Sequence, residues 1–381
     1  MISREEITIL CRPEVQQAIR ANLDRDPLQV ALDRQMPEAR LVATQIKYLQ
    51  RARRKLPGYA QACCILPPRA FEQASSEQTA AYKPIEGDRV LDLTCGLGVD
   101  AVALSRRFRR VVTLERNEAL VEVARINLQR LGITNVEVVH TSAEEYITHC
   151  RDHFDWIYAD PDRRSAEGRK LVRLEDCSPD IVALYPRLRE LADALAIKNS
   201  PLFDVEEALR YFPRSRVEVL SLDDECKEVL IYDDGRGPLI TATALGQGSY
   251  DGQQTPSIAQ PPIFDPHAYQ WLIIPDVALQ KCRLVREHLA GKADCWSENG
   301  YGFAAVRPEG VLGRIEAIEA IERFNPKLLK RALKGHRVEL LKRDFPIGIE
   351  ELRQRLAVKP GGEMRLAFTK IGEEYWTIRL K

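Results

Sequence analysis

A short glycine-rich loop flanked by acidic residues carries the clearest chemical signal in the sequence. In the segment VLDLTCGLGVDAVALS, the apolar run of a buried strand ends at Asp92, and Gly96 and Gly98 precede a helix that begins near Val99. Glycines let the main chain pass close to a ligand, and a helix N-terminus offers unpaired N–H groups. The next predicted strand ends at Glu115, where a carboxylate can hydrogen-bond the hydroxyls of a ribose.

The residues around this loop discriminate between two nucleotide cofactors. A nicotinamide or flavin site would follow the GxGxxG pattern, in which Ala101 is permitted at the third position. Asp92, however, would repel a pyrophosphate, whereas its carboxylate suits the cationic amino-acid end of S-adenosylmethionine. Asp100 could contact the ligand, or it could simply be an acidic residue favoured by the dipole in the first turn of the helix. Cys95 requires no chemical role, because a small residue is enough at its position. The sequence therefore predicts an S-adenosylmethionine site.

The third predicted strand ends beside a candidate adenine contact. Ser142, Ala143 and Glu144 follow this strand, at the position where the adenine lies in nucleoside-binding sheets. Ser142 could also cap a helix, with Glu145 three residues later completing a capping box. The sequence leaves both interpretations open.

An Asp-Pro pair ends the fourth predicted strand. In FDWIYADPDRR, Asp160 faces the cleft where open sheets bind their ligands, and Pro161 keeps it extended. A carboxylate there can accept a hydrogen bond from an amine and orient its lone pair toward an already activated methyl sulfonium. Catalysis would then come mainly from alignment. The candidate substrate contacts near this cleft are Arg163, Arg164, Lys198 and Asn199, of which the arginines could clamp a phosphate.

A parallel sheet is needed to bring these strand ends together. β-rich runs at 90–93, 111–115, 136–140, 156–160 and 194–200 alternate with stretches of helical spacing. Such alternation indicates a sheet covered by helices on both faces. The runs VEVLSL and KEVLIYD, separated only by DDEC, predict a closing hairpin. We expect an α/β fold with a seven-stranded, Rossmann-like sheet.

The 381 residues divide into four predicted parts. Residues 1–84 show helical spacing, and residues 85–250 hold the strand–helix core. Residues 251–310 begin with a Gly- and Pro-rich linker, and residues 311–381 are mixed α and β.

Composition excludes several classes of protein. With 45% hydrophobic and 29% charged residues, wholesale disorder is not expected. No apolar run reaches about 18 residues, and the charged start does not resemble a secretory signal, so neither a membrane span nor secretion is predicted. The nine cysteines form no CxxC pair. We therefore expect no disulfide framework, no metal site and a cytoplasmic location.

The C-terminal part is basic although the whole chain is neutral. The chain has 56 Lys+Arg and 56 Asp+Glu, yet residues 311–381 carry sixteen Lys/Arg against ten Asp/Glu. Lys330, Arg331 and Lys334 belong to the densest group, with Phe324 and Phe345 nearby. This asymmetry predicts a surface that binds a polyanion, and an ordinary solvated helix face is the alternative.

These motifs resemble those of a known enzyme family. VLDLTCGLGVDAVALS, VVTLERN, TSAE and YADPDRR are similar to class I S-adenosylmethionine-dependent methyltransferases. With EQASSEQTAAYK, IKNSPLFD and ECKEVLIY, the chain resembles the bacterial methyltransferase family with a THUMP-like C-terminal domain. The resemblance implies a small ferredoxin-like domain before the THUMP-like end, and RNA as partner, since THUMP domains bind RNA. The further cofactor contacts that it implies are Thr94, Cys95, Asp100, Arg116 and Asn117.

The prediction is thus an RNA methyltransferase whose C-terminal region holds the substrate. The acceptor motif departs from the Asn/Asp-Pro-Pro-Tyr form, because position 162 is Asp and no aromatic residue follows. A methyltransferase of small molecules or proteins is one alternative. A non-catalytic nucleic-acid-binding module is another, and a broken glycine loop or a missing Asp-Pro pair would indicate it; the sequence has neither.

Overall fold

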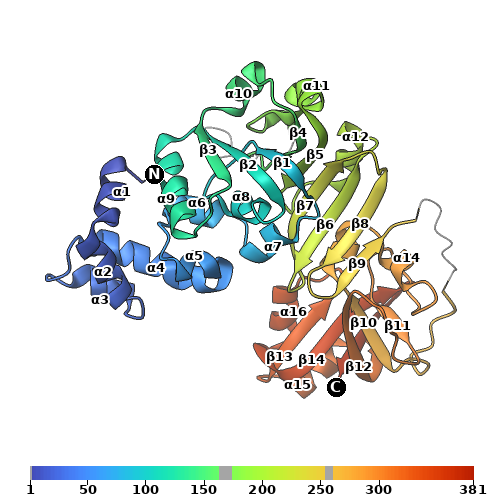
Figure 1. The fold of residues 1–381 in the computed structure, drawn as a ribbon. Coiled ribbons are helices and arrows are strands. Elements are labelled where there is room, and N and C mark those ends of the chain that lie inside the picture. The colour runs from blue at the N-terminus through green and yellow to red at the C-terminus, as the bar shows by residue number, and fades with distance from the viewer. Residues whose placement is uncertain (1, 163–173, 254–260) are drawn as a thin grey trace. The chain divides into compact units, whose positions relative to one another are not determined.

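The computed structural model describes residues 2–162, 174–253 and 261–381, so Arg163 and Arg164 lie outside the described residues. The fold is mixed α/β, with a mainly parallel sheet in the core and a second sheet near the C-terminus (Figure 1). The chain divides into two compact units. The first comprises residues 1–199 and 231–235, and the second comprises residues 200–230 and 236–381.

The first 84 residues are helical, as predicted. The helices are α1 (Arg4–Cys11), α2 (Pro13–Ala21), α3 (Pro27–Leu32), α4 (Ala39–Lys55), α5 (Pro57–Gln61), α6 (Pro68–Gln73) and α7 (Glu77–Tyr82). Local signals set their ends: Ser3 forms a capping box at α1, and Ser76 caps α7. These helices share one hydrophobic core with the glycine loop, in which Ile46 and Tyr59 cluster with Leu97.

Five parallel strands follow, and all five were predicted. They are β1 (Gly87–Asp92), β2 (Phe108–Glu115), β3 (Val136–His140), β4 (Phe154–Ala159) and β5 (Ala192–Asn199). Their order is β3-β2-β1-β4-β5. From β1 the chain adds β2 and β3 on one side and then crosses back to add β4 and β5 on the other, so the order of connection reverses between β1 and β4. The carboxyl ends of the strands meet at one edge, where open parallel sheets bind ligands.

Helices connect these strands. They are α8 (Val99–Leu104), α9 (Glu118–Arg130), α10 (Ala143–His149), the short 3-10 helix η1 (Leu174–Asp176), α11 (Ile181–Leu191) and α12 (Val205–Tyr211). Right-handed crossovers on either side of the reversal place α8 and α9 on the opposite face from α10 and α11. Residues of α8 and α9 belong to the core that the N-terminal helices also build.

The core sheet has nine strands, so the predicted number of seven is wrong. The full order is β3-β2-β1-β4-β5-β7-β6-β8-β9. The added strands are β6 (Arg216–Leu222), β7 (Glu225–Asp233), β8 (Leu239–Ala244) and β9 (Gly248–Asp251). The hairpin of β6 and β7 is confirmed, and its turn residues Asp223 and Asp224 both have positive φ. β8 and β9 were missed because glycines and prolines surround them, but β8 pairs with β6 and β9 pairs with β8.

The second sheet has the order β11-β10-β12-β15-β14-β13. Its strands are β10 (Trp271–Pro275), β11 (Gly302–Ala304), β12 (Gly313–Arg323), β13 (Arg337–Lys342), β14 (Lys359–Ile371) and β15 (Glu374–Leu380). The accompanying helices are α13 (Val277–Lys281), α14 (Val285–Leu289), α15 (Pro326–Leu333) and α16 (Ile349–Leu356). Because β10 pairs with β12, the boundary predicted between residues 310 and 311 falls within one continuous sheet. No helix in the described ranges is long and apolar enough to cross a membrane.

Candidate active site

The glycine loop between β1 and α8 takes a conformation that favours glycine. Gly96 has φ of 54° and Gly98 has φ of 81°, both in the left-handed region. The N–H of Cys95 bonds the carbonyl of Leu114, and the N–H of Gly98 bonds the carbonyl of Cys95, both at 2.8 Å. A Cβ atom placed on Gly96 would meet no atom within 4 Å. The main chain at Gly96 therefore borders open space that a ligand can enter.

Glu115 ends β2 directly beside this loop. One carboxylate oxygen accepts the N–H of Gly96 at 2.9 Å, and the other accepts the N–H of Asn117 at 2.8 Å. Burial raises the pKa of Glu115, and these main-chain N–H bonds oppose the effect by stabilising the ionised form. Each oxygen keeps a second lone pair, so the carboxylate could still accept hydrogen bonds from ribose hydroxyls.

Asp92 lies under the loop and exposes none of its surface. Its carboxylate accepts the N–H of Thr94 at 3.0 Å and the hydroxyl of Thr113 at 2.6 Å. Burial raises the pKa of Asp92 to about 7, although both hydrogen bonds favour the ionised form. Asp92 thus supports the loop from behind, and direct contact with a ligand would require the loop to move.

Asp100, in the first turn of α8, faces two buried lysines. Its Oδ1 atom lies 2.6 Å from Nζ of Lys83, and its Oδ2 atom lies 4.0 Å from Nζ of Lys198. The hydroxyl of Ser75 donates to Oδ2 at 2.8 Å. Burial alone would raise the pKa of Asp100, but the two ammonium groups outweigh it and lower the pKa to about 2. Asp100 is therefore an ionised carboxylate held by cations of the chain itself.

Asp160 directly follows β4 and contacts the same cluster. Its N–H donates to the hydroxyl of Thr94 at 2.8 Å, and one carboxylate oxygen lies 2.5 Å from Nζ of Lys198. Its side chain is 34% exposed, whereas that of Lys198 is 9% exposed. The adjacent Pro161 is buried. Asp160 is therefore the member of this cluster that an acceptor could reach.

Two of the predicted substrate contacts are buried. Lys198 pairs with Asp160 and donates to the hydroxyl of Ser75 at 2.9 Å, and Asn199 is 1% exposed. The sequence analysis also missed Lys83, which is 2% exposed, and the contact of Ser75 with Asp100. Both residues lie in EQASSEQTAAYK, a segment that the sequence analysis quotes as part of the family resemblance.

The candidate adenine residues include a helix cap. Ser142 caps α10 by accepting the N–H of Glu145 at 3.1 Å, as one of the two interpretations predicts. The reciprocal half of a capping box is not formed, because Glu145 accepts the hydroxyl of Thr141 instead, at 3.0 Å. Ala143 is buried and Glu144 is exposed. A contact of these residues with adenine stays a prediction.

The remaining motif residues have structural roles of their own. Asn117 caps α9 by accepting the N–H of Leu120 at 3.1 Å, and exposed Arg116 donates to the hydroxyl of Ser178 at 3.1 Å. Cys95 is buried, and burial raises the pKa of its thiol well above the usual range. A thiol that stays protonated is a poor nucleophile, and a contact of Cys95 with the cofactor stays a prediction.

The predicted basic group lies on and just after α15. Lys330, Arg331 and Lys334 are all exposed, and no acidic partner contacts them within the part of the chain that the structure describes. The two aromatic residues noted in the sequence do not join them. Phe324 and Phe345 pack against each other in a hydrophobic cluster, with ring centroids 5.0 Å apart.

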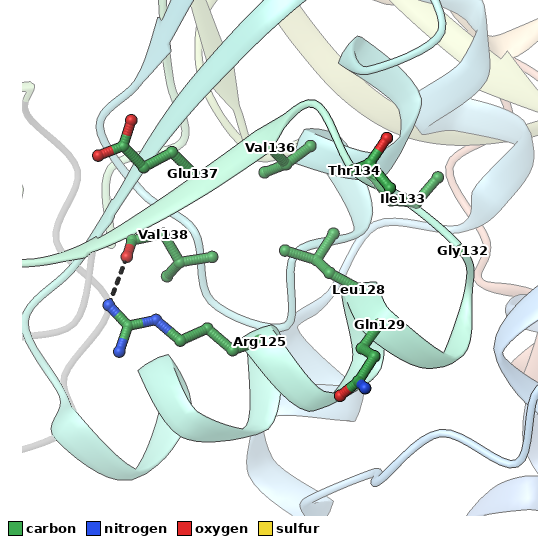
Figure 2. Close-up of a pocket in the computed structure, with 9 residues that line it drawn as sticks. All are labelled: Arg125, Leu128, Gln129, Gly132, Ile133, Thr134, Val136, Glu137 and Val138. Carbon is green, nitrogen blue, oxygen red and sulfur yellow. Dashed lines mark hydrogen bonds between the residues drawn. The ribbon is translucent and has the colours of Figure 1, made fainter.

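A hollow elsewhere, between α9 and β3, does not belong to this site. Figure 2 shows that Leu128, Val136 and Val138 line it. The Arg125 side chain spans it and donates to the carbonyl of Val138 at 2.7 Å (Figure 2). None of the loop or carboxylate residues described above lines this hollow.

Comparisons with known proteins match two parts of the chain to described families. Residues 85–204 match a family described as a methyltransferase domain, and residues 313–381 match one described as THUMP domain-like. Over 319 residues the chain is 25% identical to an uncharacterized S-adenosylmethionine-dependent methyltransferase of Mycobacterium tuberculosis (strain ATCC 25618 / H37Rv). That match covers 80% of this chain and 84% of the relative.

Two further matches are to a solved structure and to an RNA methyltransferase. The crystal structure of a Porphyromonas gingivalis W83 protein, named as a methyltransferase, matches with a TM-score of 0.81 and 25% identity. It covers 100% of this chain and 99% of that one. A shorter match, 39% identical over 103 residues, is to the 23S rRNA (uracil(1939)-C(5))-methyltransferase RlmD of Klebsiella pneumoniae. It covers 26% of this chain and 22% of that enzyme.

The glycine loop, the acidic strand ends and these matches define an S-adenosylmethionine-dependent methyltransferase. More particularly, the chain is a class I methyltransferase with a THUMP-like C-terminal domain. The family, the enzyme class and the cofactor predicted from the sequence are thereby confirmed.

Proposed function

We propose that this methyltransferase modifies RNA, and that the exposed cations of α15 hold the RNA. The observation that carries the proposal is the group of Lys330, Arg331 and Lys334, which stand exposed without acidic partners within the THUMP-like segment. Clustered cations bind a phosphate backbone by displacing its condensed counterions. The RNA-modifying activity in the name of the Klebsiella relative supports the same substrate class.

The residues at the sheet edge fit the cofactor. The open space beside Gly96 gives the ligand access to the main chain, and Glu115 would hold the ribose hydroxyls. Ser142, Ala143 and Glu144 would border the adenine. S-adenosylmethionine bound there would supply an electrophilic methyl group on a sulfonium. The leaving group of such a transfer is the sulfur, as a neutral thioether. Asp92 and Thr94 act through the loop that they hold in shape.

Asp160 would orient the acceptor. Its carboxylate is partly exposed and ion-paired with Lys198. Such a group can accept a hydrogen bond from the acceptor and aim the acceptor lone pair, while the departing proton passes to water. The rate gain would come from alignment of the reacting atoms. Arg163 and Arg164 remain candidate phosphate contacts, outside the described residues.

A small molecule or a protein as methyl acceptor is the alternative, with the basic group of α15 as a partner surface. The third hypothesis, a non-catalytic nucleic-acid module, is wrong because the chain is a methyltransferase. A cytoplasmic location stays a prediction from the sequence.

The decisive experiment measures transfer of a radiolabelled methyl group from S-adenosylmethionine to purified RNA. Total RNA from cells lacking the protein should accept label, whereas RNA from cells that contain it should accept little, because its sites are already methylated. The Asp160→Ala variant is the matched control and should label neither RNA. Label in a small-molecule or protein fraction, with none in RNA, would favour the alternative.

A further inference from the structure

A chain of alternating charges, buried except at Asp160, joins the two halves of the active site. Lys83 pairs with Asp100 at 2.6 Å, Asp100 lies 4.0 Å from Lys198, and Lys198 pairs with Asp160 at 2.5 Å. Asp100 stands behind the glycine loop, and Asp160 stands on the acceptor side. We propose that Lys198 is a positioning residue that holds the Asp160 carboxylate in place relative to the cofactor loop. The proposal rests on the function proposed above only in assigning the acceptor side to Asp160.

The surroundings of Lys198 leave its ammonium group little freedom. It donates to the hydroxyl of Ser75 at 2.9 Å and faces carboxylate oxygens of both Asp160 and Asp100. The side chain is 9% exposed, so the ammonium group has almost no water to replace a lost partner. A buried cation without a partner is costly, which favours one fixed arrangement of all three groups. Lys198 therefore acts on the Asp160 carboxylate and has little surface to offer a substrate.

Ser75 adds a second connection between the two sides. Its hydroxyl accepts from Lys198 and donates to Asp100, so it closes a small ring of polar contacts with them. Ser75 comes from the N-terminal helical part, and it is the neighbouring Ser76 that caps α7. The Ser75 hydroxyl is therefore available for its hydrogen bonds with Lys198 and Asp100.

We expect loss of Lys83 and loss of Lys198 to have different effects. Lys83 contacts the Asp100 carboxylate and the carbonyl of Thr79, so its loss should disturb the helix that follows the glycine loop. Lys198 forms an ion pair with Asp160. Removal of Lys83 should thus weaken cofactor binding, whereas removal of Lys198 should slow methyl transfer more than it weakens cofactor binding.

The test compares Lys198→Met with Lys198→Arg and Lys83→Met. Lys47→Met is the matched control, because Lys47 is an exposed lysine of α4 in the same unit. Each variant is titrated with S-adenosylhomocysteine by calorimetry, and its single-turnover methyl transfer is measured on RNA from cells lacking the protein. Crystal structures of the wild type, Lys198→Met and Lys198→Arg locate the Asp160 carboxylate. If Lys198→Met does not fold, Asp160→Asn breaks the same pair from its exposed side.

We expect Lys198→Met to lower the single-turnover rate at least tenfold while its affinity for S-adenosylhomocysteine changes less than threefold. Lys198→Arg should recover part of the rate, and the Asp160 carboxylate should leave its position only in Lys198→Met. If Asp160→Asn is the variant that folds, it should show the same split between rate and affinity. Equal losses of affinity and rate, or an unmoved Asp160 in Lys198→Met, would overturn the proposal. A wild type that methylates no RNA would refute the proposed function, and the crystal structures would still decide the role of Lys198.

Discussion

The hydroxyl group of Tyr59 donates a hydrogen bond to the main-chain carbonyl of Leu97, between the two glycines of the cofactor loop, at 3.3 Å. Tyr59 is 1% exposed, and the N–H groups of Gly58 and Tyr59 are in turn held by the carboxylate of Glu77, at 2.8 and 3.2 Å. The N-terminal helices thus build the wall behind the loop. This gives the N-terminal part a role that its sequence pattern did not indicate.

Tyr59 substitutions should separate packing from hydrogen bonding. Tyr59→Ala removes a ring from the core that the N-terminal helices share with the loop, and we expect it to lower the free energy of unfolding by about 3–5 kcal/mol. Tyr59→Phe keeps the ring and loses one long hydrogen bond, at a cost of about 0.5–1.5 kcal/mol. Urea denaturation measures both values. Similar costs for the two variants would show that the ring does not support this core.

Glu115 should dominate the polar part of cofactor affinity. Glu115→Ala removes the expected ribose contact and leaves the N–H of Gly96 without its acceptor. The loss of one charge-assisted hydrogen bond costs about 1.5–3 kcal/mol, which is roughly a ten- to hundredfold loss of affinity. Calorimetry with S-adenosylhomocysteine measures it, and Glu115→Gln should fall between the wild type and Glu115→Ala.

The control for Glu115 is Glu137→Ala, an exposed glutamate on the neighbouring strand β3 that pairs with Arg110. It should bind S-adenosylhomocysteine as the wild type does. If Glu115→Ala also bound the ligand with unchanged affinity, Glu115 would serve only the shape of the loop.

The strand-end residues could be predicted because their signals are local. A buried run that ends in Asp92 and is followed by two glycines defines a strand, a turn and a helix within a few residues. The pair of Lys198 with Asp160 could not be predicted, since it joins the ends of two strands and lysines are rarely buried. An exposed substrate contact was the ordinary expectation for Lys198, and the side-chain partners that overrule it appear only in three dimensions.

β8 and β9 were not predicted for a different reason. Gly246 and Gly248 lie around the tight connection of β8 to β9, and their positive φ values explain why glycine stands there. In the sequence these glycines indicate turns, so the short runs beside them gave no strand signal. The continuous C-terminal sheet was hidden for a related reason, because strand pairing between β10 and β12 leaves no mark in hydrophobic periodicity.

Asp92 should make the stability of the protein depend on pH. The pKa of a free aspartate is about 3.9, and burial raises that of Asp92 to about 7. The folded state therefore binds a proton more tightly than the unfolded chain does. Stability from this group is present below about pH 4 and is lost as the pH rises to about 7, on the order of 4 kcal/mol in all.

Asp92→Asn removes this titration. Between pH 5 and pH 8 the free energy of unfolding should therefore fall more in the wild type than in Asp92→Asn. Urea denaturation of both proteins at the two pH values checks the sign, and the difference between them cancels the other titrating groups. Parallel behaviour of the two proteins would mean that the buried carboxylate is already ionised at pH 5.

Binding of RNA by α15 has to be tested with point substitutions. Deletion of residues 311–381 would remove β12, β13, β14 and β15, four strands of the six-stranded sheet. It would also expose Leu272 and Phe303, which pack against Ile318 and Ile378 in one core. A deletion would therefore unfold the domain and say nothing about its surface.

Charge reversal on α15 should weaken RNA binding and its salt dependence together. Lys330, Arg331 and Lys334 are exposed, so their change to Glu should leave the fold and the affinity for S-adenosylhomocysteine intact. Each lost phosphate contact lowers the slope of log affinity against log salt by about 0.7–0.9, so three should lower it by roughly 2–3. Filter binding of structured RNA between low and moderate salt measures the slope. The control reverses Lys47, Arg106 and Arg109, which are exposed and change the net charge equally. If both triple variants lost the same affinity and slope, the effect would belong to net charge, and α15 would not be the RNA-binding surface.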